Sequence, residues 1–268
     1  MLEKTDFLSI SSVSQGHLNV WSTCQRKFQH LFIDGLNLSA TEQQDKRLLG
    51  ERFHLLMQQR ELGLDVTELA DSDPQLQKWL LTFSTEPPTT IAGDRLCEHR
   101  RTLELNIQDR AQDRCYVLAA IYDLLILGDC TAQILDWKTH ARPLSFATLQ
   151  ANWQTRLYLY ILANTSDYLP EQLSMTYWFA NTAKSVAIAY DSHQHQQTHQ
   201  DLLHILSDMS KVILDVTTTT TQLYFEQLPL GSDECMRCEF AYRCQRRGIQ
   251  DSEDFLASSL ETYPEVVI

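Results

Sequence analysis

An acidic and a basic residue lie two positions apart at the end of an apolar run. The run is QILDWKTHA, residues 133–141, and it carries Asp136 and Lys138. Residues i and i+2 of a β-strand point to the same face, so these side chains would project side by side. Taken alone, the pattern has two interpretations: an exposed ion pair at a strand end, or part of a reaction centre.

A second carboxylate, Asp123, interrupts the apolar run YVLAAIYDLLIL. A buried carboxylate without a partner is costly, so either the strand emerges into solvent at Asp123 or a cation neutralises the charge. The turn GDCT lies between this run and Asp136, so the two strands can pair antiparallel and bring the carboxylates together. Two carboxylates suit Mg²⁺ or Mn²⁺, and a lysine beside them can orient or deprotonate a water molecule or hold a phosphate.

Three cysteines, Cys235, Cys238 and Cys244, fall in the short segment CMRCEFAYRC. The chain has seven cysteines, an odd number, which favours a metal or cluster site over a framework of disulfides. A tetrahedral or cubane site needs a fourth thiolate. We expect three other cysteines, in or near predicted strands, to be small buried hydrophobes: Cys97, Cys115 and Cys130.

The composition limits the class of protein. The chain has 268 residues, of which 43% are hydrophobic and 21% charged, and its formal net charge is −13. This charge disfavours a protein that coats nucleic acid by bulk electrostatics, but it permits an enzyme with metal ions and a local basic strip. Because no apolar run is long enough to span a membrane and no secretory signal is recognisable, we expect a cytoplasmic location.

The hydrophobic periodicity predicts the elements that must position these residues. Helices are predicted over residues 11–36, 41–62, 75–83, 149–164 and 195–216. Strands are predicted over residues 100–107, 114–127 and 131–138, followed by a hairpin of residues 172–182 and 184–191. This order predicts an α/β sandwich with a small mixed sheet flanked by helices, rather than a doubly wound fold.

We predict a single domain over residues 1–250. It would comprise N-terminal helices (1–95), a catalytic core (96–190) and a C-terminal helix with the cysteine segment (191–250). The remaining residues, 251–268, form an acidic tail that we expect to be mobile. Three histidines at the start of the Gln-rich helix are expected to be exposed to solvent and not to be ligands: His193, His195 and His199.

Four short motifs, in order along the chain, resemble those of the PD-(D/E)XK nucleases, and most closely the RecB-type branch. IYD at 121–123 and ILDWKT at 134–139 resemble the catalytic core. GERFH at 50–54 resembles a glycine–histidine motif of this branch, and QTRLY at 154–158 resembles its QxxxY motif. Each motif alone is weakly specific, and their joint occurrence in this order is far more so. One departure is Ala120, where the family commonly has glycine.

The resemblance implies a restriction-endonuclease-like fold and metal-dependent cleavage of DNA. It implies that Lys138 activates the attacking water and that Gln154 and Tyr158 position the substrate. A family ligand set for Mg²⁺ or Mn²⁺ would here be His54, Asp123, Asp136 and the backbone carbonyl of Trp137. Glu98 lies where the family often has a supporting acid, and Glu104 is an alternative for that place.

The cysteine pattern is similar to that of the iron–sulfur subset of RecB-type nucleases, which includes CRISPR-adaptation nucleases and the AddB nuclease domain. The resemblance implies a 4Fe-4S cluster on Cys24, Cys235, Cys238 and Cys244. In that subset proline often follows the first cysteine, whereas Gln25 does so here. Zinc is the alternative occupant, but cysteine-rich zinc sites usually pair two CxxC hooks and this segment has one. Such a site would stabilise the domain by closing a long loop.

Basic residues surround these cysteines and could form a strip that binds DNA phosphates: Arg26, Lys27, Arg237, Arg243, Arg246 and Arg247. Phe28, Phe240 or Tyr242 could stack on bases. The alternative interpretation is that the charges are simply solvated surface.

The sequence therefore predicts a metal-dependent deoxyribonuclease that acts on single-stranded DNA or DNA ends, in repair, recombination or CRISPR-related processing. Exonuclease and endonuclease action both remain open. The chain has no GxxxxGK phosphate loop, so it would act alone or with a separate helicase or CRISPR-adaptation protein. Two alternatives remain: a catalytically silent DNA-binding or scaffold module of the same fold, and a zinc-stapled protein of other function.

Overall fold

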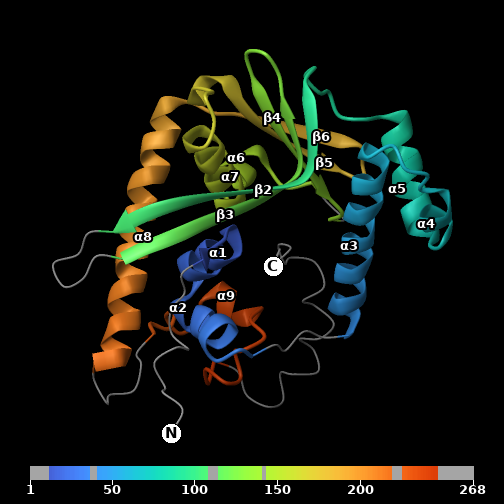
Figure 1. Cartoon of the computed structure of the whole chain (residues 1–268). Helices are drawn as coiled ribbons and strands as arrows, with labels where there is room; N and C mark the ends of the chain where they lie inside the picture. The colour runs from blue at the N-terminus through green and yellow to red at the C-terminus, as the bar shows by residue number, and fades with distance from the viewer. Residues whose placement is uncertain (1–11, 37–40, 108–113, 141–142, 219–224, 247–268) are drawn as a thin grey trace, which may run out of the picture. The chain divides into compact units, whose positions relative to one another are not determined.

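A computed structural model describes residues 12–36, 41–107, 114–140, 143–218 and 225–246 (Figure 1). The chain divides into two compact units. The first unit contains residues 1–44, 104–118 and 200–268, and the second contains residues 45–103 and 119–199. The predicted acidic tail, 251–268, lies outside the described residues, and the single-domain partition stays a prediction.

The first unit combines short N-terminal elements with the C-terminal part of the chain. Its elements are β1 (Ser12–Val13), α1 (Gln15–Thr23), α2 (Gln25–Phe28), the π-helical turn η1 (Gln29–Ile33), most of α8 (Ser192–Thr218) and α9 (Asp233–Met236). β1 pairs in parallel with the first half of β3 (Arg114–Leu127), with Val13 opposite Leu118. The ring of Trp21 packs edge-on against Phe28 and Phe225, which joins the N-terminal helices to the segment before α9.

The helix predicted over residues 11–36 is wrong as a single element, because the backbone breaks at Cys24. Cys24 has extended dihedral angles, φ −161° and ψ 114°, and separates α1 from α2. Its Sγ accepts a hydrogen bond from the Lys27 amide at 3.5 Å, so the cysteine serves as the N-cap of α2. The break therefore places the Cys24 thiol at the start of α2, where the first backbone N–H groups have no acceptor within the helix.

The second unit contains the mixed sheet. β3, β4 (Ala132–Lys138), β5 (Leu173–Phe179) and β6 (Lys184–Ala189) pair in that order, and β2 (Asp94–Ile107) pairs with β3. The β3–β4 and β5–β6 pairs are antiparallel, whereas β4 and β5 are parallel. The helices are α3 (Thr41–Glu61), α4 (Thr67–Asp71), α5 (Pro74–Thr85), α6 (Phe146–Ala151) and α7 (Trp153–Asn164), with the 3-10 turn η2 (Pro170–Gln172). The predicted α/β class with a small mixed sheet flanked by helices is confirmed.

Strand β4 separates two layers of helices, because its side chains alternate between the faces of the sheet. Leu135 and Trp137 join a buried apolar cluster with residues of α3 and α5, among them Phe53. Asp136 and Lys138 point to the other face, where Gln154 of α7 contacts both. All seven residues of β4 are buried, as expected for a strand covered on both faces.

The helix predicted over residues 149–164 is divided at Asn152 into α6 and α7. The Asn152 side chain accepts a hydrogen bond from the Gln154 amide at 2.8 Å, so it caps α7. The cap sets the start of α7 at Trp153, so Gln154 lies in the first turn of the helix.

Two expectations about individual side chains are wrong. Cys115 and Cys130 are exposed, so they are not core residues, whereas Cys97 is half-buried and packs against the apolar cluster that contains Phe53. His193 is exposed as expected, but His195 and His199 are half-buried because their rings stack on Tyr160. The Tyr160 hydroxyl lies 2.7 Å from Nδ1 of His199.

Within the described part of the chain, no helix is both long and apolar enough to cross a bilayer.

The apolar cluster between α5 and the sheet predicts a large effect for Phe83→Ala. The Phe83 ring lies edge-on to Trp137 and Trp178, at centroid distances of 5.4 and 5.1 Å. Its loss leaves a cavity, so the free energy of unfolding should fall by about 3–5 kcal/mol in urea titrations. The control is Leu81→Ala on the same helix, where the side chain is 65% exposed and the change should stay within about 0.5 kcal/mol. Equal effects of the two substitutions would contradict this packing.

Candidate functional site

Asp136 and Lys138 form a buried ion pair. Their exposed fractions are 2% and 5%, and Nζ of Lys138 lies 2.8 Å from a carboxylate oxygen of Asp136. The interpretation as an exposed ion pair at a strand end is therefore wrong. The prediction that the two side chains project together from one face of a strand is confirmed.

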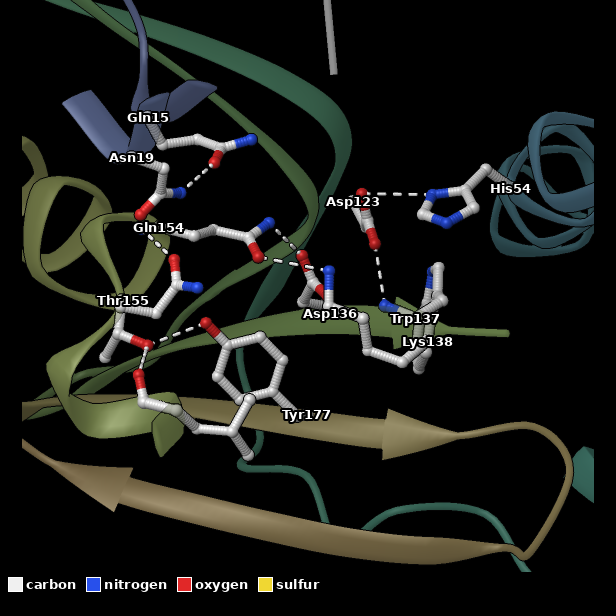
Figure 2. Close-up of polar contacts among 12 residues, drawn as sticks. Gln15, Asn19, His54, Asp123, Asp136, Trp137, Lys138, Gln154, Thr155 and Tyr177 are labelled. Carbon is white, nitrogen blue, oxygen red and sulfur yellow. Dashed lines mark hydrogen bonds and ion pairs between the residues drawn. The ribbon is translucent and has the colours of Figure 1, made fainter. Parts of the chain in front are cut away.

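Gln154 binds both members of this pair (Figure 2). Its side-chain N–H donates to the carboxylate of Asp136, and its carbonyl oxygen accepts from Lys138 Nζ at 3.0 Å. The amide therefore fixes both charged groups at once, and the cap at Asn152 fixes the helix turn that carries it. Buried charges are tolerated only when they are paired and hydrogen-bonded in this way.

Two residues that the sequence did not single out complete this side of the site. The hydroxyls of Thr155 and Tyr177 lie 2.7 Å apart and join α7 to β5 (Figure 2). The Tyr177 ring also lies beneath the ammonium group of Lys138, 5.6 Å from its centroid. Period-two alternation along YWF could have placed Tyr177 on the Lys138 face, but no local signal indicates the contact with Thr155.

Asp123 lies next to Asp136 because β3 and β4 pair antiparallel. Leu124 is opposite Leu135, so continuing the register by one residue places the two aspartates opposite each other. One carboxylate oxygen of Asp123 accepts the Trp137 amide at 2.7 Å, and the other lies 3.2 Å from Nδ1 of His54 (Figure 2). The Asp123 side chain is 11% exposed, so the strand does not emerge into solvent there.

Charge compensation explains the ionisation of Asp123. Burial raises its pKa, but the nearby His54, the Trp137 amide and Lys138 together outweigh burial and hold the pKa below its ordinary value. The carboxylate is therefore charged at neutral pH, as a ligand for a hard cation must be.

Glu98 completes a group of possible metal ligands. It has a positive φ of 47° within β2, a conformation rare for a residue other than glycine. Ligand atoms of His54, Glu98 and Asp123 all lie within 4.8 Å of one another. Burial and the negative charge of Asp123 raise the pKa of Glu98, and a bound cation would relieve this repulsion. Two carboxylates and an imidazole are a suitable donor set for Mg²⁺ or Mn²⁺.

This group overlaps only partly with the ligand set that the resemblance implies. His54 and Asp123 belong to both sets. Asp136 is instead engaged with Lys138 and Gln154, and Trp137 contributes its amide to the site through Asp123. Of the two glutamates proposed as supporting acids, Glu98 is in the group of ligand atoms, and the exposed Glu104 is not a member of it.

Tyr158, the second residue of the predicted QxxxY motif, is buried under the same face of the sheet. It is 3% exposed, and its ring lies edge-on to that of Tyr122 at 5.3 Å. Burial, with the nearby carboxylates of Asp136 and Asp123, raises the pKa of Tyr158, so its phenol stays neutral. Tyr122 also donates to the Tyr158 backbone carbonyl at 3.1 Å, which ties α7 to β3.

The four cysteines of the predicted cluster site line one pocket in the first unit: Cys24, Cys235, Cys238 and Cys244. None of them is in a disulfide. Burial raises the pKa of Cys238 to about 11, and burial together with Cys24 also raises the pKa values of Cys235 and Cys244. Thiols gathered in this way favour their neutral forms until a cation stabilises the thiolates.

Basic residues line the same pocket. Arg26, Lys27 and Arg246 all contribute to its wall. Lys27 pairs with Glu239 at 3.1 Å, and Arg246 donates to the Leu228 carbonyl at 2.7 Å. Lys27 and Arg246 therefore already bind other groups of the protein. Of the other basic residues proposed for DNA binding, Arg237 and Arg243 are exposed, and Arg247 lies outside the described residues.

The aromatic residues proposed for base stacking differ in exposure. Phe28 and Phe240 are fully buried, so the expectation that they stack on bases is wrong. Tyr242 is 61% exposed, so its ring remains accessible for stacking on a base. The two phenylalanines lie instead in the packing around the cysteine segment, where Phe28 contacts Trp21 and Phe240 contacts His30.

Comparison with known protein families supports the interpretation of this geometry. The model of the PD-(D/E)XK nuclease superfamily matches residues 12–245. The chain belongs to this superfamily. The match spans both the sheet that carries Asp123, Asp136 and Lys138 and the segments that carry the four cysteines.

One solved structure shows the same fold. A candidate exonuclease from Eubacterium rectale is 10% identical, with a TM-score of 0.51 and coverage of 93% of this chain and 94% of that chain. The protein SSO0001 is also 10% identical, with a TM-score of 0.41 and coverage of 88% and 86%. At this identity the likeness to the Eubacterium rectale protein shows the fold alone. No curated protein matches the chain significantly.

The ligand group of this PD-(D/E)XK protein predicts that Glu98→Gln weakens Mn²⁺ binding. The substitution removes one charged oxygen donor, so the dissociation constant from calorimetry should rise by roughly tenfold or more. The matched control is Glu104→Gln, which alters an exposed glutamate on the same strand and should leave the constant unchanged. A larger effect at Glu104 than at Glu98 would contradict this assignment.

Proposed function

We propose that this PD-(D/E)XK protein is a metal-dependent deoxyribonuclease of the RecB type. The observation that carries the proposal is the pairing of Lys138 with Asp136 and Gln154 on the strand next to Asp123. Burying an ammonium group beside three candidate ligands, His54, Glu98 and Asp123, lowers the stability of the fold. Such a cost is typical of a functional site. Their donor types suit a divalent cation and a phosphodiester substrate.

The metal would be Mg²⁺ or Mn²⁺, held by His54, Glu98 and Asp123 and, by family resemblance, by Asp136 and the Trp137 carbonyl. When bound, it supplies a Lewis acid for the phosphate and an acidified water. The other residues of the site orient the charged groups. The Trp137 amide and His54 orient the Asp123 carboxylate, and Gln154 holds Asp136 and Lys138 in register.

Lys138 would orient and activate the attacking water. Its ammonium group contacts Asp136 and Gln154, and these two contacts fix the position of Nζ at the end of β4. Hydrolysis forms a bond from the water oxygen to phosphorus and breaks the bond to the leaving sugar oxygen. Gln154 and Tyr158 would position the substrate, Gln154 through the groups it holds and Tyr158 through its packing against Tyr122 of β3.

The cysteine pocket would hold a 4Fe-4S cluster on Cys24, Cys235, Cys238 and Cys244. Four thiols from two distant segments of the chain face one pocket, which is the donor set that such a cluster requires. Zinc uses the same donors, and the metal content of the protein distinguishes the two. The site would staple the N-terminal helices to the C-terminal segment.

The substrate would be single-stranded DNA or DNA ends. Arg243 and Tyr242 are exposed beside the cysteine segment and can contact a strand, together with Arg26, Lys27, Arg246 and Arg247. A separate helicase or a CRISPR-adaptation protein would supply opened DNA, in repair, recombination or CRISPR-related processing. We propose a cytoplasmic location for this activity.

The nuclease proposal predicts that Lys138→Ala strongly slows cleavage. Protein purified without oxygen would be incubated with labelled single-stranded and duplex DNA and with Mn²⁺ or Mg²⁺. The rate for Lys138→Ala should fall by about 10²–10⁴-fold, because the water loses its orienting group. Lys184→Ala, an exposed lysine on β6, is the control and should keep the wild-type rate. A folded wild-type protein that binds DNA but never cleaves it would favour the silent binding module.

The cluster proposal predicts that Cys238→Ala loosens the fold. We expect loss of the brown colour and a fall in the free energy of unfolding of a few kcal/mol, since the loop is no longer closed. Cys115→Ala removes an exposed cysteine and should change neither property. Full colour and an unchanged melting temperature in Cys238→Ala would refute the staple, and stoichiometric zinc without iron in the wild type would favour the zinc alternative.

A further inference from the structure

A buried histidine lies against one of the four cysteines. His30, in η1, is 4% exposed, and its Nε2 lies 3.7 Å from Sγ of Cys244. This distance is within the range of a hydrogen bond to sulfur. The residues that line the cysteine pocket include Cys244 but not His30, so the imidazole contacts the sulfur from outside the pocket.

The orientation of the His30 ring is fixed from its other side. Nδ1 of His30 lies 3.0 Å from a carboxylate oxygen of Asp34, one helical turn later in the chain. The Asp34 amide in turn donates to the Gln29 carbonyl at 2.8 Å, which holds the aspartate at the end of η1. The ring also packs on Phe240 at a centroid distance of 5.0 Å. These contacts direct Nε2 at a single sulfur.

The chemistry of the two neighbours determines what the ring can do. A carboxylate and a thiolate are both hydrogen-bond acceptors, so the ring donates to both only when it carries an N–H on each nitrogen. Hydrogen bonds to the sulfur ligands of iron–sulfur clusters draw electron density from the sulfur and tune the reduction potential. Cys244 would therefore differ from the other three ligands in its electronic character.

We propose that His30, oriented by Asp34, is a positioning residue that donates a hydrogen bond to the Cys244 ligand and raises the reduction potential of the cluster. The inference rests on the proposed iron–sulfur site and adds to it a residue outside the four ligands. The hydrogen bond stabilises the reduced cluster more than the oxidised one, because reduction adds negative charge to the sulfurs.

Other charges act on the same site and must stay constant in a test. Arg26 and Arg246 lie close enough to influence the Cys244 thiol, and Lys27, paired with Glu239, lines the pocket near Cys238. None of these side chains is altered by a substitution at His30. The effect of the imidazole can therefore be separated from the background field of the basic residues.

The test is the reduction potential of the purified, oxygen-free protein, measured by a redox titration followed by EPR and visible absorption. His30→Leu should shift the potential to a more negative value, whereas His30→Gln, which keeps an N–H donor, should restore most of the shift. Asp34→Asn should give an intermediate shift in the same direction. His17→Leu is the matched control, because the His17 ring packs on Phe28 and Phe32 in the same unit. This substitution should leave the reduction potential unchanged.

The outcomes separate this inference from the proposal on which it rests. A wild-type cluster whose potential is the same in His30→Leu would overturn the role of His30 and leave the cluster intact. Zinc, or no metal, in the wild type would overturn both. If His30→Leu cannot hold the cluster, Asp34→Asn and His30→Gln decide: a negative shift in Asp34→Asn with little shift in His30→Gln supports the proposal, and no shift in Asp34→Asn refutes it.

Discussion

The buried pair of Asp136 and Lys138 is the interaction on which the second unit depends. Two opposite charges 2.8 Å apart in a strand that is buried along its whole length would destabilise the unit if either lost its partner, by about 3–5 kcal/mol. Gln154 makes the arrangement tolerable because its amide satisfies both groups. The cap at Asn152 fixes the first turn of α7, which delivers this amide to the pair.

The same strand connects stability with chemistry through its alternation. Trp137 points into the apolar cluster, where Phe83 and Trp178 contact it, and this packing anchors the backbone between the two charged residues. The Trp137 amide then holds Asp123 on the neighbouring strand. A rigid core on one face therefore fixes a polar constellation on the other, which is how a sheet can keep reactive groups in place without a flexible loop.

The N-terminal helices of the first unit are short, with nine residues in α1 and four in α2. The packing of this unit relies on aromatic contacts such as those of Trp21 with Phe28 and Phe225, and on four cysteines that share one pocket. A metal or cluster bound there would add its binding free energy to the stability of these segments. His30, which contacts Cys244, would tune the reduction potential of a cluster bound there.

The sequence by itself determined those features that depend on neighbours along the chain. Alternation placed Asp136 and Lys138 on one face, and the short turn after β3 brought Asp123 to them. The tertiary structure alone decided the break at Cys24, the positive φ that directs Glu98, the exposure of Cys115 and the burial of Phe28 and Phe240. It also decided the contact of His30 with Cys244, which are 214 residues apart. The physical reason is that periodicity records only which face of an element is apolar, whereas a contact between distant residues depends on how those faces pack together.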